Sequence, residues 1–191
     1  MATSHLQSMR RWQPELDLDA EPIAESKNNP AAFSVLYDRY VQPVYRYLFY
    51  RVGSVPEAED LTSQTFLAAL EALPRYQHRG NFAAWLFCIA RTRVIDYIRT
   101  QHRQLPLADT QLAETADPLA QIAHSDEIAQ LSSLLHLLDD DERELIGLRY
   151  TAGLPFAEIA VILGSNQNTV KKTLYRILAR LQSQMEDLHH G

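Results

Sequence analysis

The chain has 191 residues, of which 46% are hydrophobic and 22% are charged, and its formal net charge is −6. This composition is typical of a globular protein rather than of a disordered or fibrous one. Its single cysteine, Cys88, excludes an internal disulfide and a CxxC metal site and predicts a cytoplasmic location. Because no run approaches the roughly 18 apolar residues of a membrane span, we expect no membrane insertion.

Strand signals are almost absent, so the expected fold class is all-α. Residues 1–28 form a predicted mobile leader without the apolar core of a signal peptide. Asn29 and Pro30 then mark a helix start, and apolar residues recur at helical spacing over 33–48. Gly53 is predicted to end that helix.

Two more helices complete a predicted three-helix bundle over 29–104. Ser54 and Glu57 match a capping box, and the second helix is expected to stop at Pro74. A loop over 75–81 follows. Asn81 can cap the third helix.

The remaining segments have contrasting charge. Residues 105–127 contain five acidic and no basic residues, which predicts a flexible acidic linker. Residues 128–185 form a second predicted helical domain, in which Asp139 caps a helix, and 186–191 form a tail. The fold is therefore expected to consist of two small helical domains joined by a flexible linker.

The second domain ends in two helices with helix-turn-helix proportions, predicted over 156–163 and from Asn168 to about Met185. Gly164 suits the left-handed backbone at the end of the first helix, and Asn168 is predicted to cap the second. The second helix places an apolar stripe on one side and a basic, polar face on the other. The candidate duplex-DNA contacts on that face are Asn168, Thr169, Lys171, Lys172, Tyr175 and Arg176.

A basic helix of this kind suits the major groove of DNA. Arg176 is able to contact a guanine edge with two hydrogen bonds, whereas Lys171 and Lys172 are expected to contact phosphates. A helical hairpin with a solvated basic face would give the same pattern, and the motif alone does not distinguish a repressor from other helix-turn-helix proteins.

Three stretches, "AEDLTSQTF", "AWLFCIAR" and "EIAVILG…TVK", occur in this order. They resemble regions 2 and 4 of bacterial sigma-70 factors, over about residues 31–104 and 128–183. With only a short linker between the two regions, the layout resembles the extracytoplasmic-function (ECF, group IV) type. The resemblance implies a transcription initiation factor that binds core RNA polymerase and directs promoter recognition and strand opening.

The resemblance also implies roles for each region. The helix after Glu57 would bind the clamp helices of the polymerase β′ subunit, and the second domain would bind the −35 element as duplex, near the β flap. The resemblance further implies an anti-sigma factor as a partner. The residues implied for polymerase binding are Asp60, Leu61, Gln64 and Phe66.

The loop at 75–81 and the following helix would capture unpaired bases of the −10 element. Their chemistry is compatible with this role, because single-stranded DNA binds where aromatic platforms lie beside positive charge. Trp85, Phe87 and Ile89 are expected to belong to the core instead. The candidate −10 contacts are Tyr76, Arg79, Asn81, Arg91, Arg99 and Arg103.

Signals for an enzyme are poor. The sequence has no glycine-rich phosphate loop, and its histidines are scattered without metal spacing. We therefore expect no catalytic residue, cofactor or metal site. Two other hypotheses remain open: a polymerase-independent helix-turn-helix transcriptional regulator, and an interaction module whose helices bind only a regulatory protein.

Overall fold

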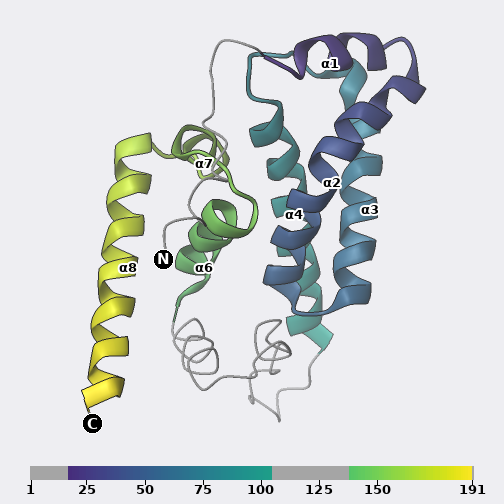
Figure 1. Ribbon diagram of the computed structural model, residues 1–191. Coiled ribbons are helices and arrows are strands. Elements are labelled where there is room, and N and C mark those ends of the chain that lie inside the picture. Colours follow the sequence, from purple (N-terminus) through teal and green to yellow (C-terminus); the bar gives the residue numbers. More distant parts are fainter. Residues whose placement is uncertain (1–16, 105–137, 191) are drawn as a thin grey trace, which may run out of the picture.

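The computed structural model of the chain describes residues 17–104 and 138–190, and the regular elements in those two ranges are all helices (Figure 1). The all-α class is thereby confirmed. The predicted linker at 105–127, and the start of the second predicted domain up to residue 137, lie outside the described residues. In the described ranges, no helix has the length and apolar character needed to cross a membrane.

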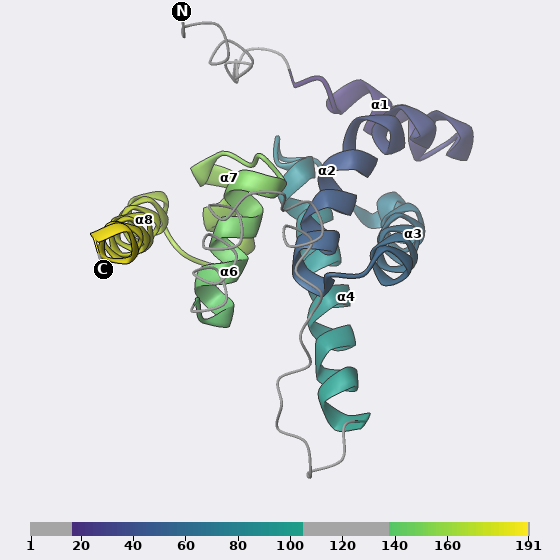
Figure 2. The same cartoon turned by 60° about the horizontal axis from the view of Figure 1, so that its bottom comes forward.

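Helices α2, α3 and α4 form a three-helix bundle, with α1 lying across the end where α2 begins (Figures 1 and 2). Gly53 has a φ of 71° and ends α2 as predicted, because a left-handed backbone at a helix end favours glycine. The bounds of the elements are α1 Ala20–Ser26, η1 Pro30–Phe33, α2 Ser34–Val52, α3 Val55–Ala72, η2 Leu73–Arg75 and α4 Phe82–Gln104.

The cap of α3 differs in its bonding from the prediction. Ser54 is the N-cap residue, but its side chain accepts no bond from the helix backbone. Its hydroxyl instead donates to the carboxylate of Glu57. The sequence therefore predicted the position of the helix start correctly and the capping-box bonds wrongly.

The C-terminal part begins with a capping box that is complete, in which Asp139 accepts from the backbone of Glu142 at 2.8 Å and Glu142 accepts in return. The predicted N-cap at Asp139 is confirmed. The elements that follow are α6 Asp140–Ile146, the π-helical turn η3 Gly147–Thr151, α7 Phe156–Ile162 and α8 Gln167–His190.

The turn between α7 and α8 has Gly164 at a φ of 61°, as predicted. The predicted cap of α8 at Asn168 is wrong. Asn166 performs this role, because its side-chain oxygen accepts from the Thr169 amide at 2.8 Å. Asn168 lies within the first turn of α8, so its side chain is free to face outward.

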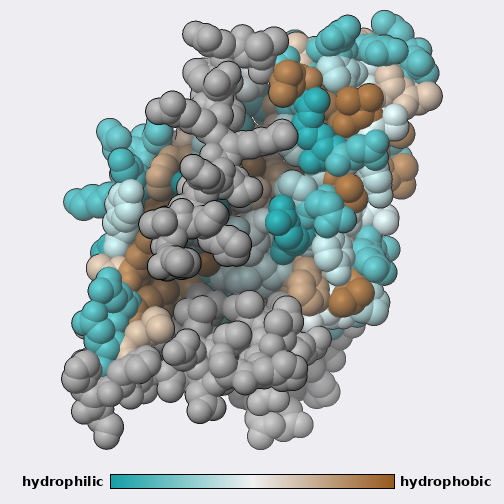
Figure 3. All heavy atoms as spheres, viewed as in Figure 1, coloured by the Kyte–Doolittle hydropathy of each residue, from teal (hydrophilic) through white to brown (hydrophobic). Residues whose placement is uncertain are grey.

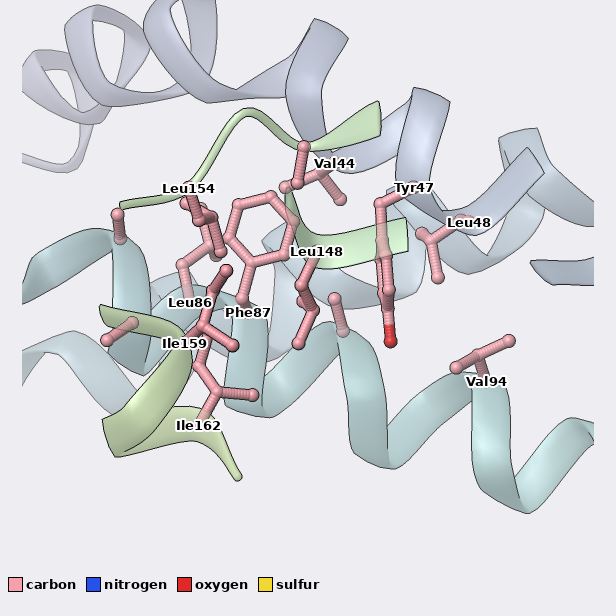
Figure 4. Close-up of a cluster of buried hydrophobic side chains, with 14 of the residues drawn as sticks. Val44, Tyr47, Leu48, Leu86, Phe87, Val94, Leu148, Leu154, Ile159 and Ile162 are labelled. Atoms are coloured by element: carbon pink, nitrogen blue, oxygen red, sulfur yellow. The ribbon is translucent and has the colours of Figure 1, made fainter. Parts of the chain in front are cut away.

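The two parts share one continuous hydrophobic core. Side chains from α2 and α4 point toward side chains from η3, the following loop and α7, with Phe87 lying beside Leu154 and Ile159 (Figure 4). The approach is close at Gly147, where an added Cβ would lie 2.9 Å from the ring of Tyr50. The domains therefore dock directly on one another, whereas the sequence predicted only a flexible linker between them.

The predicted mobile leader is wrong for residues 17–28. Helix α1 buries Ile23, which is 1% exposed, against the end of the bundle. The Asp19 carboxylate pairs with Arg39 and accepts a 2.5 Å hydrogen bond from the Tyr40 hydroxyl, both on α2. This segment is thus a packed part of the fold.

Candidate nucleic-acid and polymerase interfaces

Helix α8 presents the predicted basic face to solvent. Its apolar stripe is buried, with Val170, Leu174 and Ile177 at most 3% exposed, so the opposite side must point outward. Lys171 places its ammonium group 5.9 Å from the ring centre of Tyr175. All six predicted residues are exposed: Asn168, Thr169, Lys171, Lys172, Tyr175 and Arg176. This face is a surface able to enter a DNA groove.

Arg180, one turn beyond this face, has a structural contact. Its Nη2 donates to the Glu142 carboxylate at 2.5 Å, which ties α8 to the start of α6. That hydrogen bond raises the pKa of the Arg180 guanidinium further above its already high value. The charge of Arg180 therefore contributes to the contact between α8 and α6.

The loop at 75–81 rests on an aromatic support. The ring of Tyr76 lies 4.4 Å from that of Trp85 and 5.8 Å from that of Phe82, both on the first turns of α4. Burial, together with the nearby Asp17 and Asp19 carboxylates, raises the pKa of the Tyr76 phenol to about 12, so it stays neutral.

Two of the predicted −10 residues lie on the outside of this loop. Arg79 and Asn81 are both exposed, and the Arg79 guanidinium donates to Gln77 at 3.3 Å. The structure therefore brings Tyr76, Arg79 and Asn81 together on one loop. An arginine and an amide beside an aromatic platform are suited to an unpaired base.

The arginines of α4 do not all join that loop. Arg99 is exposed but lies further along the helix, and the side chain of Arg103 is outside the described residues. Arg91 is half-buried, with its Nε 3.5 Å from a carboxylate oxygen of Glu144 on α6. In this arrangement Arg91 contributes its charge to the contact between the domains, while its side chain remains 35% exposed.

Helix α3 divides the four predicted polymerase contacts into two pairs. Asp60 and Gln64 are exposed and are linked by a 2.7 Å hydrogen bond from the Gln64 amide. Leu61 and Phe66 are 4% and 5% exposed and belong to the core. They therefore cannot contact a partner from this position, and we reassign them to packing, since the Phe66 ring lies edge-on to the ring of Tyr37 at 4.8 Å.

Sequence reasoning missed Leu67, which is 59% exposed on α3. It follows Gln64 by three positions and Asp60 by seven, so all three lie on one helix face. The sequence contains a signal for this residue, because Leu67 is apolar and lies on the same helix face as the polar Asp60 and Gln64. The space-filling view shows apolar side chains among polar ones over the side of the molecule formed by α1 to α3 (Figure 3).

Groups suited to metal binding or nucleophilic chemistry are not prominent. Within 17–104 and 138–190, no cluster of three or more His, Cys, Asp or Glu residues is arranged to hold a metal ion. Cys88 is half-buried, and burial raises the pKa of its thiol, which disfavours the reactive thiolate.

Comparison with known proteins gives a consistent result. Family models for sigma-70 region 2 and for sigma-70 region 4 match residues 36–104 and 128–181. The chain is 35% identical over 161 residues to the ECF RNA polymerase sigma factor BldN of Streptomyces coelicolor, covering 82% of this chain and 61% of BldN. It thus spans less than two thirds of that relative.

Other relatives match over more of their length. The chain is 31% identical over 175 residues to the ECF RNA polymerase sigma factor SigD of Mycobacterium tuberculosis, covering 87% of this chain and 81% of SigD. The corresponding values for the ECF RNA polymerase sigma factor SigX of Bacillus subtilis are 30% over 162 residues, 81% and 84%.

Two solved structures share the fold. CnrH, in complex with the cytosolic domain of CnrY, matches with a TM-score of 0.65 and 24% identity, covering 87% of this chain and 96% of CnrH. The sigma factor RpoE of Bartonella quintana, in complex with the anti-sigma factor NepR, matches with a TM-score of 0.61 and 22% identity, covering 81% and 96%.

Proposed function

The chain belongs to the sigma-70 family, as an ECF RNA polymerase sigma factor, and from this premise we propose how its surfaces work. It binds core RNA polymerase in the cytoplasm and directs the enzyme to promoters. Its first domain, 29–104, binds the −10 element and assists strand opening, and its second, 128–185, binds the −35 element. It makes and breaks no covalent bond itself, because the polymerase supplies the chemistry.

One observation carries this proposal: a single chain has two exposed surfaces suited to two forms of DNA. The face of α8 that includes Lys172 and Arg176 offers charged, hydrogen-bonding side chains on a helix, which suits a duplex groove. The loop with Arg79 and Asn81 stands over aromatic rings, which suits unpaired bases. A promoter whose −35 element is duplex and whose −10 element is unpaired requires both surfaces.

We assign polymerase binding to the exposed face of α3. Asp60 and Gln64 supply polar contacts there, and Leu67 supplies an apolar one. An interface that combines a buried apolar anchor with a polar rim is typical of stable protein complexes. The clamp helices of the β′ subunit are the partner that the family resemblance indicates for this face, and the β flap is the partner for the second domain.

We also infer that an anti-sigma factor binds this chain. The structure of RpoE holds the anti-sigma factor NepR, and the present chain has the same fold. An inhibitor of this kind would cover the polymerase- or DNA-binding faces. The apolar residues exposed on the first domain, including Leu67 and Tyr37 at 42%, are suited to such a contact.

The alternative is a helix-turn-helix regulator that acts without polymerase. Two measurements separate it from the proposed function: capture of core polymerase by the purified chain, and run-off transcription by the reconstituted holoenzyme on a genomic fragment library. We expect stable capture and discrete start sites that share two promoter elements. Specific duplex binding by the free chain, with no polymerase capture and no run-off product, would establish the alternative.

A matched pair of variants sharpens this experiment. Arg176→Glu reverses a charge on the proposed −35 face, whereas Arg46→Glu reverses one on an exposed position of α2. We expect the first to abolish start-site selection and the second to leave it intact. An interaction module that binds only a regulatory protein would leave transcription unchanged in both variants.

A further inference from the structure

Residues 17–27 make two contacts with the loop at 75–81. The Lys27 ammonium donates to the carbonyl oxygen of Tyr76 at 2.6 Å, and a carboxylate oxygen of Asp17 lies 2.5 Å from Nε2 of His78. The pairs are separated by 49 and 61 residues in the sequence. Both contacting residues precede the sigma-70 region 2 match, which begins at residue 36.

The segment that makes these contacts is fixed to the bundle. Ile23 is 1% exposed in the core, and Ser26 is 4% exposed. Asp19 pairs with Arg39 and accepts the hydroxyl of Tyr40, so α2 holds the start of α1. Because it is anchored in this way, the segment is able to restrain the loop rather than follow it.

The contacts leave other side chains of the loop exposed. Tyr76 has an extended backbone, with φ −67° and ψ 128°, and successive side chains of an extended chain point to opposite sides. Tyr76 and His78 are half-buried, whereas Gln77 and Arg79 between and after them are exposed. Residues 17–27 thus hold the Tyr76 backbone and the His78 side chain and leave the Arg79 side chain exposed.

A chain of contacts connects Asp17 to the aromatic rings under the loop. The Tyr76 hydroxyl lies 3.3 Å from Nδ1 of His78, whose Nε2 faces Asp17. This arrangement fits a histidine that donates from Nε2 to the carboxylate and accepts the phenol at Nδ1. The Tyr76 ring in turn packs on Trp85 at the start of α4. The position of the loop is therefore set from both ends.

We propose that Asp17 and Lys27 are positioning residues for −10 recognition. They hold the loop so that Arg79 and Asn81 already face outward when the promoter arrives. A loop held in one geometry keeps Arg79 and Asn81 at fixed positions, so it cannot shift to accommodate a mismatched base, whereas a loosened loop can. This inference rests on the proposed function, because it assumes that the loop reads the −10 element.

The test measures base preference rather than activity alone. Run-off products are compared for the full chain with core polymerase on a mapped promoter and on templates with one base changed in the −10 or the −35 element. The variants are Lys27→Ala, Lys27→Arg and Asp17→Asn, with Glu25→Ala as the control, because Glu25 is exposed on α1, two residues before Lys27. We expect Lys27→Ala to reduce the −10 preference about threefold to tenfold, the net effect of one ordinary hydrogen bond, because Lys27 is exposed to solvent.

The −35 preference should stay unchanged, Lys27→Arg should restore most of the −10 preference, and Asp17→Asn should reduce it less than Lys27→Ala. A variant that merely loses folded protein gives less product on every template and leaves the ratio constant. If Lys27→Ala shows the same −10 preference as the wild type, the inference is overturned while the proposed function stays intact. A wild-type chain without promoter-specific product would overturn both.

Discussion

The Arg51 guanidinium on α2 donates to the Glu144 carboxylate on α6, joining side chains that are 5% and 3% exposed and 93 residues apart in the sequence. The Tyr47 hydroxyl donates to the same carboxylate at 2.6 Å. Burial, and then the Glu144 charge, raise the pKa of Tyr47 well above its ordinary value, so this phenol remains a donor. A hydrogen-bonded ion pair is therefore the polar centre of the contact between the two domains.

Glu144→Ala should separate the domains. The substitution leaves the Arg51 guanidinium buried without its partner, which destabilises proteins by about 3–5 kcal/mol. We expect a lower Tm and a larger radius of gyration in small-angle X-ray scattering. Asp140→Ala is the matched control, because Asp140 lies on the same helix with a side chain that is 84% exposed, and its effect should stay within about 0.5 kcal/mol.

The double variant Arg51→Met with Glu144→Leu distinguishes a lost contact from an unpaired charge. Replacing both members of a buried pair by apolar residues is often neutral or stabilising. We therefore expect the double variant to regain the compact shape that Glu144→Ala loses. Equal expansion of both variants would show that the domains dock through the charge itself rather than through the apolar core around it.

Local patterns allowed the sequence to predict much of each domain. The apolar stripe of α8 that includes Val170 and Leu174 follows helical periodicity, and periodicity is independent of distant contacts. The cap of α8 was harder to predict. Asn166 and Asn168 are equally good capping residues two positions apart, and the choice depends on how the chain leaves α7, where the Ser165 amide bonds to the carbonyl of Ala160.

Long-range contacts could not be predicted from the sequence. The pairing of Arg51 with Glu144 depends on domain docking, which no local pattern encodes. Leu61 and Phe66 show a different difficulty: a motif shared with a family includes residues that build a helix as well as residues that contact a partner. Only the burial of their side chains in the structure separates the two roles.

Leu67→Asp should weaken polymerase binding without unfolding the protein. Leu67 is 59% exposed, so a charge at this position removes an apolar contact and costs little in the free chain. Phe66→Ala should leave polymerase affinity unchanged and lower the free energy of unfolding by about 3–5 kcal/mol, because it leaves a cavity in the core. Polymerase affinity by surface plasmon resonance and Tm by calorimetry check the pair. If Leu67→Asp keeps full polymerase affinity at a temperature where the variant is folded, the exposed face of α3 is not part of the interface.

Arg176→Ala and Lys172→Ala should affect −35 binding differently. An arginine that contacts a base edge provides about 1–3 kcal/mol of discrimination at one position, so Arg176→Ala should relax specificity there. Lys172→Ala removes a proposed phosphate contact, so it should weaken binding to all sequences alike and lower the salt slope by about one. Binding of the holoenzyme to substituted −35 elements across a salt series measures both effects. Uniform weakening by Arg176→Ala would assign it to the backbone instead.

The stability of the docked fold should depend on Glu158 of α7. Burial, and then the Asp19 charge, raise the pKa of this carboxyl from 4.5 to about 7. The folded state therefore binds the proton more tightly than the unfolded chain. Stability from this group is fully present below about pH 4.5 and falls as the pH rises through 7, because the desolvated carboxylate must then form in the folded state.

Glu158→Gln should remove this pH dependence, because the amide does not ionise. At pH 8 we expect the variant to be more stable than the wild type by roughly 1 kcal/mol, a value reduced for the partial exposure of the side chain. Urea unfolding at pH 5, 6, 7 and 8 provides the measurement. Glu21→Gln, at an exposed position of α1, is the control that should keep the wild-type slope. Parallel curves for Glu158→Gln and the wild type would mean that Glu158 is solvated and that α7 does not hold it against Asp19.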